Sequence, residues 1–212
     1  RCSTQARDTS PRYGCTFDLN SSGHYNDPFT VNVVPRAARP VPLAHKCVLN
    51  SDPTLMATAF HYDPLYLEHY AGDGHPERPE RLASTIAHLR QQPWFDSLIP
   101  LAATPADETQ IHPIHAPEYV TRARHACEAG HSYLDVPDVG ISARSYDAAT
   151  LAAGSAIAMA DAVVERRVRN AFGLSRPPGH HAEASLALGF CLFNNVAVAA
   201  RHMQSQHGLD KV

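Results

Sequence analysis

The segment from residue 171 to residue 198 constrains the fold of this chain more than any other. It opens with a short apolar run at residues 171–175 between two turn signals, the pattern of a strand buried on both faces of a sheet. A Pro-Pro-Gly turn, two adjacent histidines and a Gly-Phe pair follow, and a helical pattern ends the segment. Upstream, strand-like runs alternate with longer helical patterns. This order predicts an α/β fold with a mainly parallel sheet.

His180 and His181 follow the carboxyl end of the predicted strand. In open parallel sheets the ligand crevice lies outside the carboxyl ends of the strands. Two adjacent histidines alone are more often structural, but a tight turn after Gly179 can bring both imidazoles around one small volume. Because imidazole titrates near neutral pH, one ring can accept a proton from water while the other donates one to a leaving group. The pattern therefore predicts a general acid–base site.

The patterns upstream predict the scaffold around this segment. We expect a strand at residues 57–61, an edge strand near Pro100, and helices that begin at Pro79 and Pro117. Ser145 is expected to cap a long helix. The inner face of that helix carries small residues that allow close packing on a sheet, namely Ala148, Ala149, Ala152, Ala153, Gly154 and Ala158.

Composition excludes several classes of function. Hydrophobic residues make up 44% of the chain and charged residues 18%, as in globular proteins, and no run approaches the roughly 18 apolar residues of a membrane span. The net charge of −3 provides no basic stripe for nucleic acid. Five cysteines without a CxxC pair favour a reducing compartment, so we expect a cytoplasmic protein. His112 and His115 lack ligand partners at metal spacing, which favours capping or packing roles.

Residues 1–55 differ from the rest of the chain. They contain six prolines and no glutamate, and no period of two or 3.6 residues persists in them. We expect this part to be a disordered or non-native extension, with Met56 as the start of an organised domain at residues 56–212.

Three motifs carry most of the specific sequence information: RPPGHHAE at residues 176–183, GFCLFNNVAVAA at residues 189–200, and GHPERPERL at residues 74–82. Together they resemble the motifs of zinc-dependent histone deacetylases. The resemblance covers about residues 57–212 and is closest to the class II branch and to bacterial relatives, including acetylpolyamine amidohydrolases. It implies a three-layer arginase/deacetylase-like α/β fold, with Zn²⁺ as cofactor and an acylated amine as substrate.

The resemblance also implies roles for individual residues. His180 and His181 match tandem histidines that hydrogen-bond a metal-bound water, and His181 is the better candidate for general base and then general acid. The carbonyl of Gly189 matches one that receives the acetamide N–H, and Phe190 matches a wall of the acyl-lysine tunnel.

Two further roles rest on loop alignment. Asp138 matches a polar residue that holds the substrate backbone, and Arg81 matches an arginine beside an internal cavity proposed for acetate release. Structural roles, as a solvated acid and as a cation at a helix start, stay open for both.

The family's zinc ligands come from an Asp-x-Asp-x-His segment after the FNNVAVAA helix and from a later aspartate, and its catalytic tyrosine lies further on. The sequence stops at Val212, where that strand would begin, and Asp210 has no histidine after it. We therefore expect a fold truncated before the metal-binding strand, without zinc ligands, and inactive alone.

Three functions follow from these observations. The first is a zinc-dependent deacetylase that acts on acetyl-lysine in proteins and is represented here by its N-terminal part. The second is an amidohydrolase of acetylpolyamines or other small acylated amines, although the loop at residues 75–81 carries no insertion that would narrow a tunnel. The third is an inactive module that binds acyl-lysine.

Overall fold

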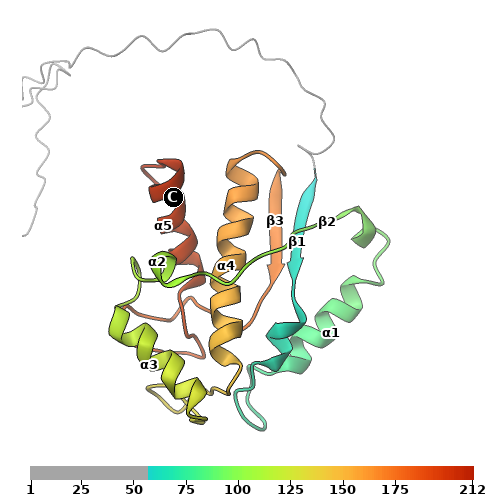
Figure 1. Ribbon diagram of the computed structural model, residues 1–212. Coiled ribbons are helices and arrows are strands. Elements are labelled where there is room, and N and C mark those ends of the chain that lie inside the picture. The colour runs from blue at the N-terminus through green and yellow to red at the C-terminus, as the bar shows by residue number, and fades with distance from the viewer. Residues whose placement is uncertain (1–56) are drawn as a thin grey trace, which may run out of the picture. The chain divides into compact units, whose positions relative to one another are not determined.

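The computed structural model describes residues 57–212, and these residues form a parallel sheet with helices packed against it (Figure 1). Three strands, β1 (Thr58–Tyr62), β2 (Ile99–Pro100) and β3 (Asn170–Leu174), lie in the order β2-β1-β3. Both pairings are parallel, and Phe60 of β1 lies opposite Phe172 of β3. The predicted α/β class is confirmed, and so is the edge position of the strand at Pro100. The expected extension at residues 1–55 and the start at Met56 lie outside the described residues.

Within residues 57–212, seven helical segments connect and cover the strands. They are η2 (Pro64–Glu68), α1 (Pro79–Leu89), η3 (Phe95–Ser97), α2 (Glu108–Ile111), α3 (Pro117–Glu128), α4 (Ser145–Val164) and α5 (Asn195–His207). As predicted, Pro79 and Pro117 occupy the first turns of α1 and α3. Backbone N–H groups in a first turn have no partner within the helix, so proline, which lacks this group, costs no hydrogen bond there. Asn194 caps α5, because its side-chain oxygen accepts a hydrogen bond from the N–H of Ala197.

Helix α4 lies between β3 and α5, and it packs against both (Figure 1). Its small residues allow this close packing, as predicted: Ala148, Ala149, Ala152 and Ala153 are buried, whereas Ala158 is partly buried. At Gly154 a Cβ atom would lie 1.9 Å from the carbonyl oxygen of Thr104. Only glycine therefore fits where this helix crosses the segment that leads to α2.

The predicted role of Ser145 is wrong. Ser145 is the first residue of α4, and the flanking Arg144 makes no side-chain cap. The hydroxyl of Ser145 instead accepts a hydrogen bond from the N–H of Ser142 at 2.8 Å and bonds Nδ1 of His69 at 2.7 Å. This buried hydroxyl connects the helix start to η2, a tertiary partner that capping preferences do not anticipate.

Helix α4 also corrects the expectation that no apolar run approaches the length of a membrane span. Within residues 57–212 it is the one helix long and apolar enough to cross a membrane by length and composition, with a mean hydropathy of 1.3. More than half of that window is buried inside the structure. A helix that is apolar on most sides is also what the core of a globular domain requires.

Strand β3 differs from the expected strand buried on both faces. Ala171 and Gly173 face α4, but Phe172 points to the opposite face and is 52% exposed. On that face it stacks on Phe60, which contacts Phe95 of η3 edge-on. Among the described residues β3 pairs only with β1 and forms an edge of the sheet, so its apolar run indicates a strand without specifying how both of its faces are covered.

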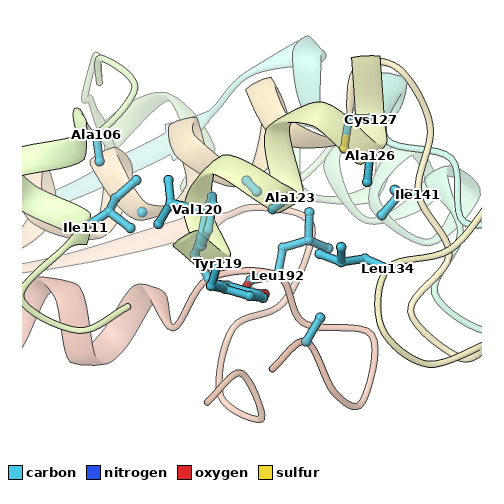
Figure 2. Close-up of a cluster of buried hydrophobic side chains, with 14 of the residues drawn as sticks. Ala106, Ile111, Tyr119, Val120, Ala123, Ala126, Cys127, Leu134, Ile141 and Leu192 are labelled. Atoms are coloured by element: carbon cyan, nitrogen blue, oxygen red, sulfur yellow. The ribbon is translucent and has the colours of Figure 1, made fainter. Parts of the chain in front are cut away.

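The largest apolar cluster holds the segment that follows the histidine pair. Ile111, Tyr119 and Val120 are fully buried in it together with Leu192 and Phe193. Figure 2 shows Tyr119 reaching from α3 toward Leu192, and its hydroxyl donates to the Leu192 carbonyl at 2.6 Å. The core thus fixes the backbone between the histidines and α5.

His115 has the packing role that the sequence predicts. It is fully buried, its Nδ1 donates to the Glu183 carbonyl, and its Nε2 accepts from the N–H of Asn194, both at 2.8 Å. Burial lowers the pKa of His115, which favours the neutral ring that can accept this second hydrogen bond. The imidazole connects the two ends of the segment between the histidine pair and α5.

Candidate active site

The histidine pair lies in a tight turn beyond the carboxyl end of β3. The N–H of Ala182 donates to the Gly179 carbonyl at 3.2 Å, and the ring centroids of His180 and His181 are 4.2 Å apart. A Cβ atom at Gly179 would come within 2.3 Å of the Phe193 carbonyl oxygen, so the turn can pack on the start of α5 only with glycine there. The local prediction of two imidazoles around one small volume is confirmed.

A cavity of about 550 Å³ opens beside this turn. Every predicted site residue except Asp138 lines it; the lining comprises Pro76, Glu77, Arg81, Pro178, His180, His181, Gly189 and Phe190. A second cavity of about 300 Å³ shares Glu77, Arg81 and Pro178 with it and extends to the end of β3. Two segments far apart in the sequence, residues 76–81 and residues 178–190, therefore meet at the carboxyl edge of the sheet, where ligand sites of parallel sheets form.

Gly189 and Phe190 form one wall of the cavity. Both have left-handed backbone conformations, with φ of 55° and 69°, and this conformation is costly for phenylalanine. A Cβ atom at Gly189 would lie 2.6 Å from Cδ2 of His181, so the glycine lets the backbone lie directly against the imidazole. The Phe190 ring contacts the His75 ring edge-on, with centroids 4.7 Å apart.

Asp138 is connected to this wall through His75. Nδ1 of His75 lies 3.1 Å from both the backbone nitrogen and the carbonyl oxygen of Glu77, and Nε2 lies 3.2 Å from the Asp138 carbonyl oxygen. The carboxylate of Asp138 is exposed and does not line the cavity. Its role in holding a substrate backbone stays a prediction.

A buried ionic network lies beneath the cavity. Arg176 donates to both carboxylate oxygens of Glu77, at 2.5 and 2.8 Å, and to the Tyr66 carbonyl at 2.7 Å. Nε2 of His69 lies 3.2 Å from Glu77, and His69, Glu77 and Arg176 are each at most 3% exposed. Burial alone would raise the pKa of Glu77, but the contacts with His69 and Arg176 outweigh it and lower the pKa to about 2.

This lowered pKa predicts a pH dependence of stability. Because the folded-state pKa of Glu77 lies below its ordinary value of 4.5, the stabilisation is present above that pH and is lost as pH falls toward 2. Between about pH 6 and pH 3 the parent should lose about 2 kcal/mol more free energy of unfolding than the Glu77→Gln variant. Urea unfolding at both pH values measures this difference.

Glu165→Gln is the matched control, because Glu165 forms an exposed pair with Arg167. Its pH dependence should follow that of the parent. If Glu77→Gln also follows the parent, the carboxylate of Glu77 does not carry the acid sensitivity.

Three groups around the cavity limit its chemistry. The rings of His180 and His181 are exposed, and no hydrogen-bond partner within residues 57–212 orients them. Cys191 is buried behind His181, and burial raises the pKa of its thiol. A protonated, enclosed thiol is a poor nucleophile, so the exposed imidazoles are the groups available for proton transfer.

The residues beside the histidine pair do not by themselves fit a zinc site. Within the described part of the chain, the three groups with metal-ligand spacing are Asp161, His202 and His207, and none of them lines this cavity. The zinc-binding segment that the family resemblance places after α5 is not tested by these residues. A larger cavity of about 1160 Å³ lies between α3 and residues 129–135 and includes none of the predicted site residues.

Sequence reasoning missed His75, Glu77 and Arg176 as parts of the site. All three belong to the motifs at residues 74–82 and 176–183, but no role was inferred for them. Glu77 and Arg176 are 99 residues apart in the chain. No local spacing in the sequence indicates such a pair.

Comparison with known proteins adds a family assignment to this geometry. A family model described as "Histone deacetylase domain" matches residues 75–212. The chain is 38% identical over 141 residues to "Polyamine deacetylase HDAC10" of Homo sapiens, covering 64% of this chain and 21% of that protein. It is 36% identical over 172 residues to "Histone deacetylase-like amidohydrolase" of Pseudomonas aeruginosa, covering 73% of this chain and 45% of that protein.

A solved structure is similar in fold as well. The structure titled "Crystal Structure of HDA15 HD domain" superposes with a TM-score of 0.68 at 35% identity, covering 72% of this chain and 44% of that one. The chain thus spans less than half the length of each of these three proteins. The predicted arginase/deacetylase-like α/β fold is confirmed by this similarity.

Proposed function

Because the chain belongs to the histone deacetylase family, we propose that it supplies the proton-transfer and acyl-binding part of an amidohydrolase that removes acetyl groups from acetyl-lysine in proteins. The observation that carries this proposal is the cavity that joins His180 and His181 to Gly189 and Phe190. An amide hydrolase needs a base for water, an acid for the amine and a slot for the acyl chain, and these residues have the corresponding chemistry.

In this proposal His181 accepts the proton of the attacking water and returns it to the leaving amine. Its exposed ring lies against Gly189, whose carbonyl is proposed to receive the amide N–H of the substrate. Phe190 offers an aromatic wall for the aliphatic lysine stem. Arg81, which borders both cavities, would favour an anionic product such as acetate in the second cavity.

The family is generally zinc-dependent, and a bound zinc ion would polarise the amide carbonyl. Residues 57–212 provide no ligand set beside the histidines. We therefore assign to the residues described only proton transfer, orientation and acyl binding, and zinc dependence is a separate expectation for the full-length protein.

A second candidate substrate is an acetylated polyamine. The printed name of the human relative supports it, and so does the exposed carboxylate of Asp138, whose backbone is hydrogen-bonded to the His75 that packs on Phe190. A carboxylate can accept an N–H from a peptide backbone, or it can attract the ammonium group of a polyamine. Binding of the polyamine would need the negative charge of Asp138, whereas binding of the peptide backbone would need only a hydrogen-bond acceptor.

The test measures turnover of an acetyl-lysine peptide and of an acetylated polyamine by the full-length protein. Peptide turnover should exceed polyamine turnover, and Asp138→Asn should keep most of the peptide kcat/KM, because the amide oxygen still accepts a hydrogen bond. The second candidate would be favoured if the parent turned over the polyamine faster than the peptide, and if Asp138→Asn lost much of its kcat/KM for the polyamine only. Binding of acyl-lysine peptide without turnover of either substrate would overturn the enzymatic proposal and indicate a binding module.

A further inference from the structure

Three metal-ligating side chains meet at the edge of the sheet opposite the histidine pair. Asp161 lies near the end of α4, and His202 and His207 lie in the last turns of α5. Nε2 of His202 is 2.8 Å and Nε2 of His207 is 2.7 Å from the same oxygen of Asp161. The three ligand atoms all lie within 4.8 Å of one another.

The position of this cluster separates it from the proposed active site. Helix α5 begins beside the histidine turn, where Asn195 donates to the Pro177 carbonyl, and it ends beside the last turns of α4 (Figure 1). Neither cavity at the histidine pair is lined by Asp161, His202 or His207. An inference about this cluster therefore does not depend on the proposed function.

The chemistry of the three groups suits a borderline transition metal. Two imidazoles and one carboxylate are a common ligand set for Zn²⁺, and solvent can occupy the remaining position. The side chains are 15%, 19% and 25% exposed, so the cluster is held by packing and yet reachable by an ion. Each Nε2 lies within hydrogen-bond distance of Asp161, and metal binding would require the tautomer of each imidazole whose proton is on Nδ1, so that the lone pair of Nε2 faces the ion.

The scaffold holds the ligands without further rearrangement of the fold. Helices α4 and α5 form the most extensive helix pair in the described part of the chain, and the two histidine rings have centroids 5.8 Å apart at an interplanar angle of 70°. Rigid elements place ligands more accurately than loops do. An ion between the three atoms would require them to move apart from the hydrogen-bond distances of 2.7 and 2.8 Å.

We propose that Asp161, His202 and His207 bind a divalent transition-metal ion, Zn²⁺ in the first place, that joins the C-terminal ends of α4 and α5. The ion has a structural role, because it bridges two helices and faces neither of the cavities described at the histidine pair. Metal that binds only the folded state stabilises it, so Tm should rise by roughly 5–10 °C at a hundredfold excess of Zn²⁺ over Kd.

The experiment compares Zn²⁺ stoichiometry, by dialysis against ZnCl₂ and metal analysis, in the parent chain and in His202→Gln and His207→Gln. Glutamine keeps an N–H that can donate to Asp161 but removes the imidazole ligand. Each variant should bind one zinc ion fewer than the parent and lose the zinc-dependent rise in Tm. Far-UV circular dichroism without metal checks that the variants stay folded.

His88→Gln is the matched control, because His88 also lies in the last turn of a helix but outside the cluster. It should bind as much zinc as the parent. Co²⁺ gives a second readout, since its visible absorption in the parent should indicate nitrogen and oxygen donors and should disappear in His207→Gln. Equal zinc stoichiometry in the parent and both cluster variants would overturn the proposal and leave a purely hydrogen-bonded link between the helices.

Discussion

Replacing His181 by alanine in the full-length protein should lower kcat/KM for its acetylated substrate by about 10²–10⁴-fold, the range expected for loss of a general base. Its ring is exposed in the cavity and lies against the backbone of Gly189, where the proposal places the scissile amide. The loss should fall mainly on kcat, because the base acts on the attacking water and contributes little to binding of the acyl chain.

His88→Ala serves as the control, because it removes an exposed imidazole from α1, away from the cavity. It should leave kcat and KM unchanged. A loss of less than about tenfold in His181→Ala, in a protein with parent-like circular dichroism and Tm, would show that another group moves the proton.

Replacing Arg176 by methionine should reduce the free energy of unfolding by about 3–5 kcal/mol, the usual cost of breaking a buried ion pair. Methionine keeps an unbranched apolar stem but leaves the carboxylate of Glu77 and the carbonyl of Tyr66 without the donors that Arg176 provides. A large cost follows because Glu77 is 2% exposed and water cannot replace the lost hydrogen bonds without local opening. Urea unfolding with an unchanged m value measures this loss.

Two further variants make this result specific to the buried pair. Arg167→Met removes an exposed partner of Glu165 and should cost at most about 1 kcal/mol. In the double variant Glu77→Gln/Arg176→Met the buried negative charge is gone, so it should recover part of the stability lost in Arg176→Met. Equal costs for Arg176→Met and Arg167→Met would mean that the buried pair contributes no more than a surface pair.

The sequence predicted most of the elements because their signals are local. Proline at the first turn starts α1 and α3, Pro100 restricts β2 to an edge, and small residues mark the helix that packs on the sheet. The histidine pair was predicted as a site from the strand and the turn before it. Backbone preferences and turn chemistry act within a few residues, so they can be recognised without the fold.

Two of the wrong expectations depend on partners distant in sequence. Ser145 has the residue type of a helix cap, but His69, 76 positions earlier, takes up its hydroxyl. Phe172 belongs to an apolar run, yet it is half exposed because the described elements cover that face only in part. Capping and hydrophobic patterns report a preference, and packing decides whether it is realised.

The candidate metal cluster shows the same limit for function. His202 and His207 are five residues apart, a spacing that places two Cβ atoms about 140° apart around a helix axis, so it does not indicate a shared site. Asp161 lies 41 residues before His202, on another helix. Only the packing of α4 against α5 brings the three ligand atoms together.

By itself, the sequence determined the α/β class, the positions of most helices and strands, and the histidine turn with the Gly-Phe pair that lines its cavity. The tertiary structure alone decided the buried contact of Glu77 with Arg176, the packing of His75 on Phe190, and the meeting of Asp161 with two histidines of α5. The physical reason is the distance along the chain over which each kind of interaction acts. Turn and helix preferences act between neighbours along the chain, whereas ion pairs, ring contacts and ligand sets depend on which distant side chains are desolvated together.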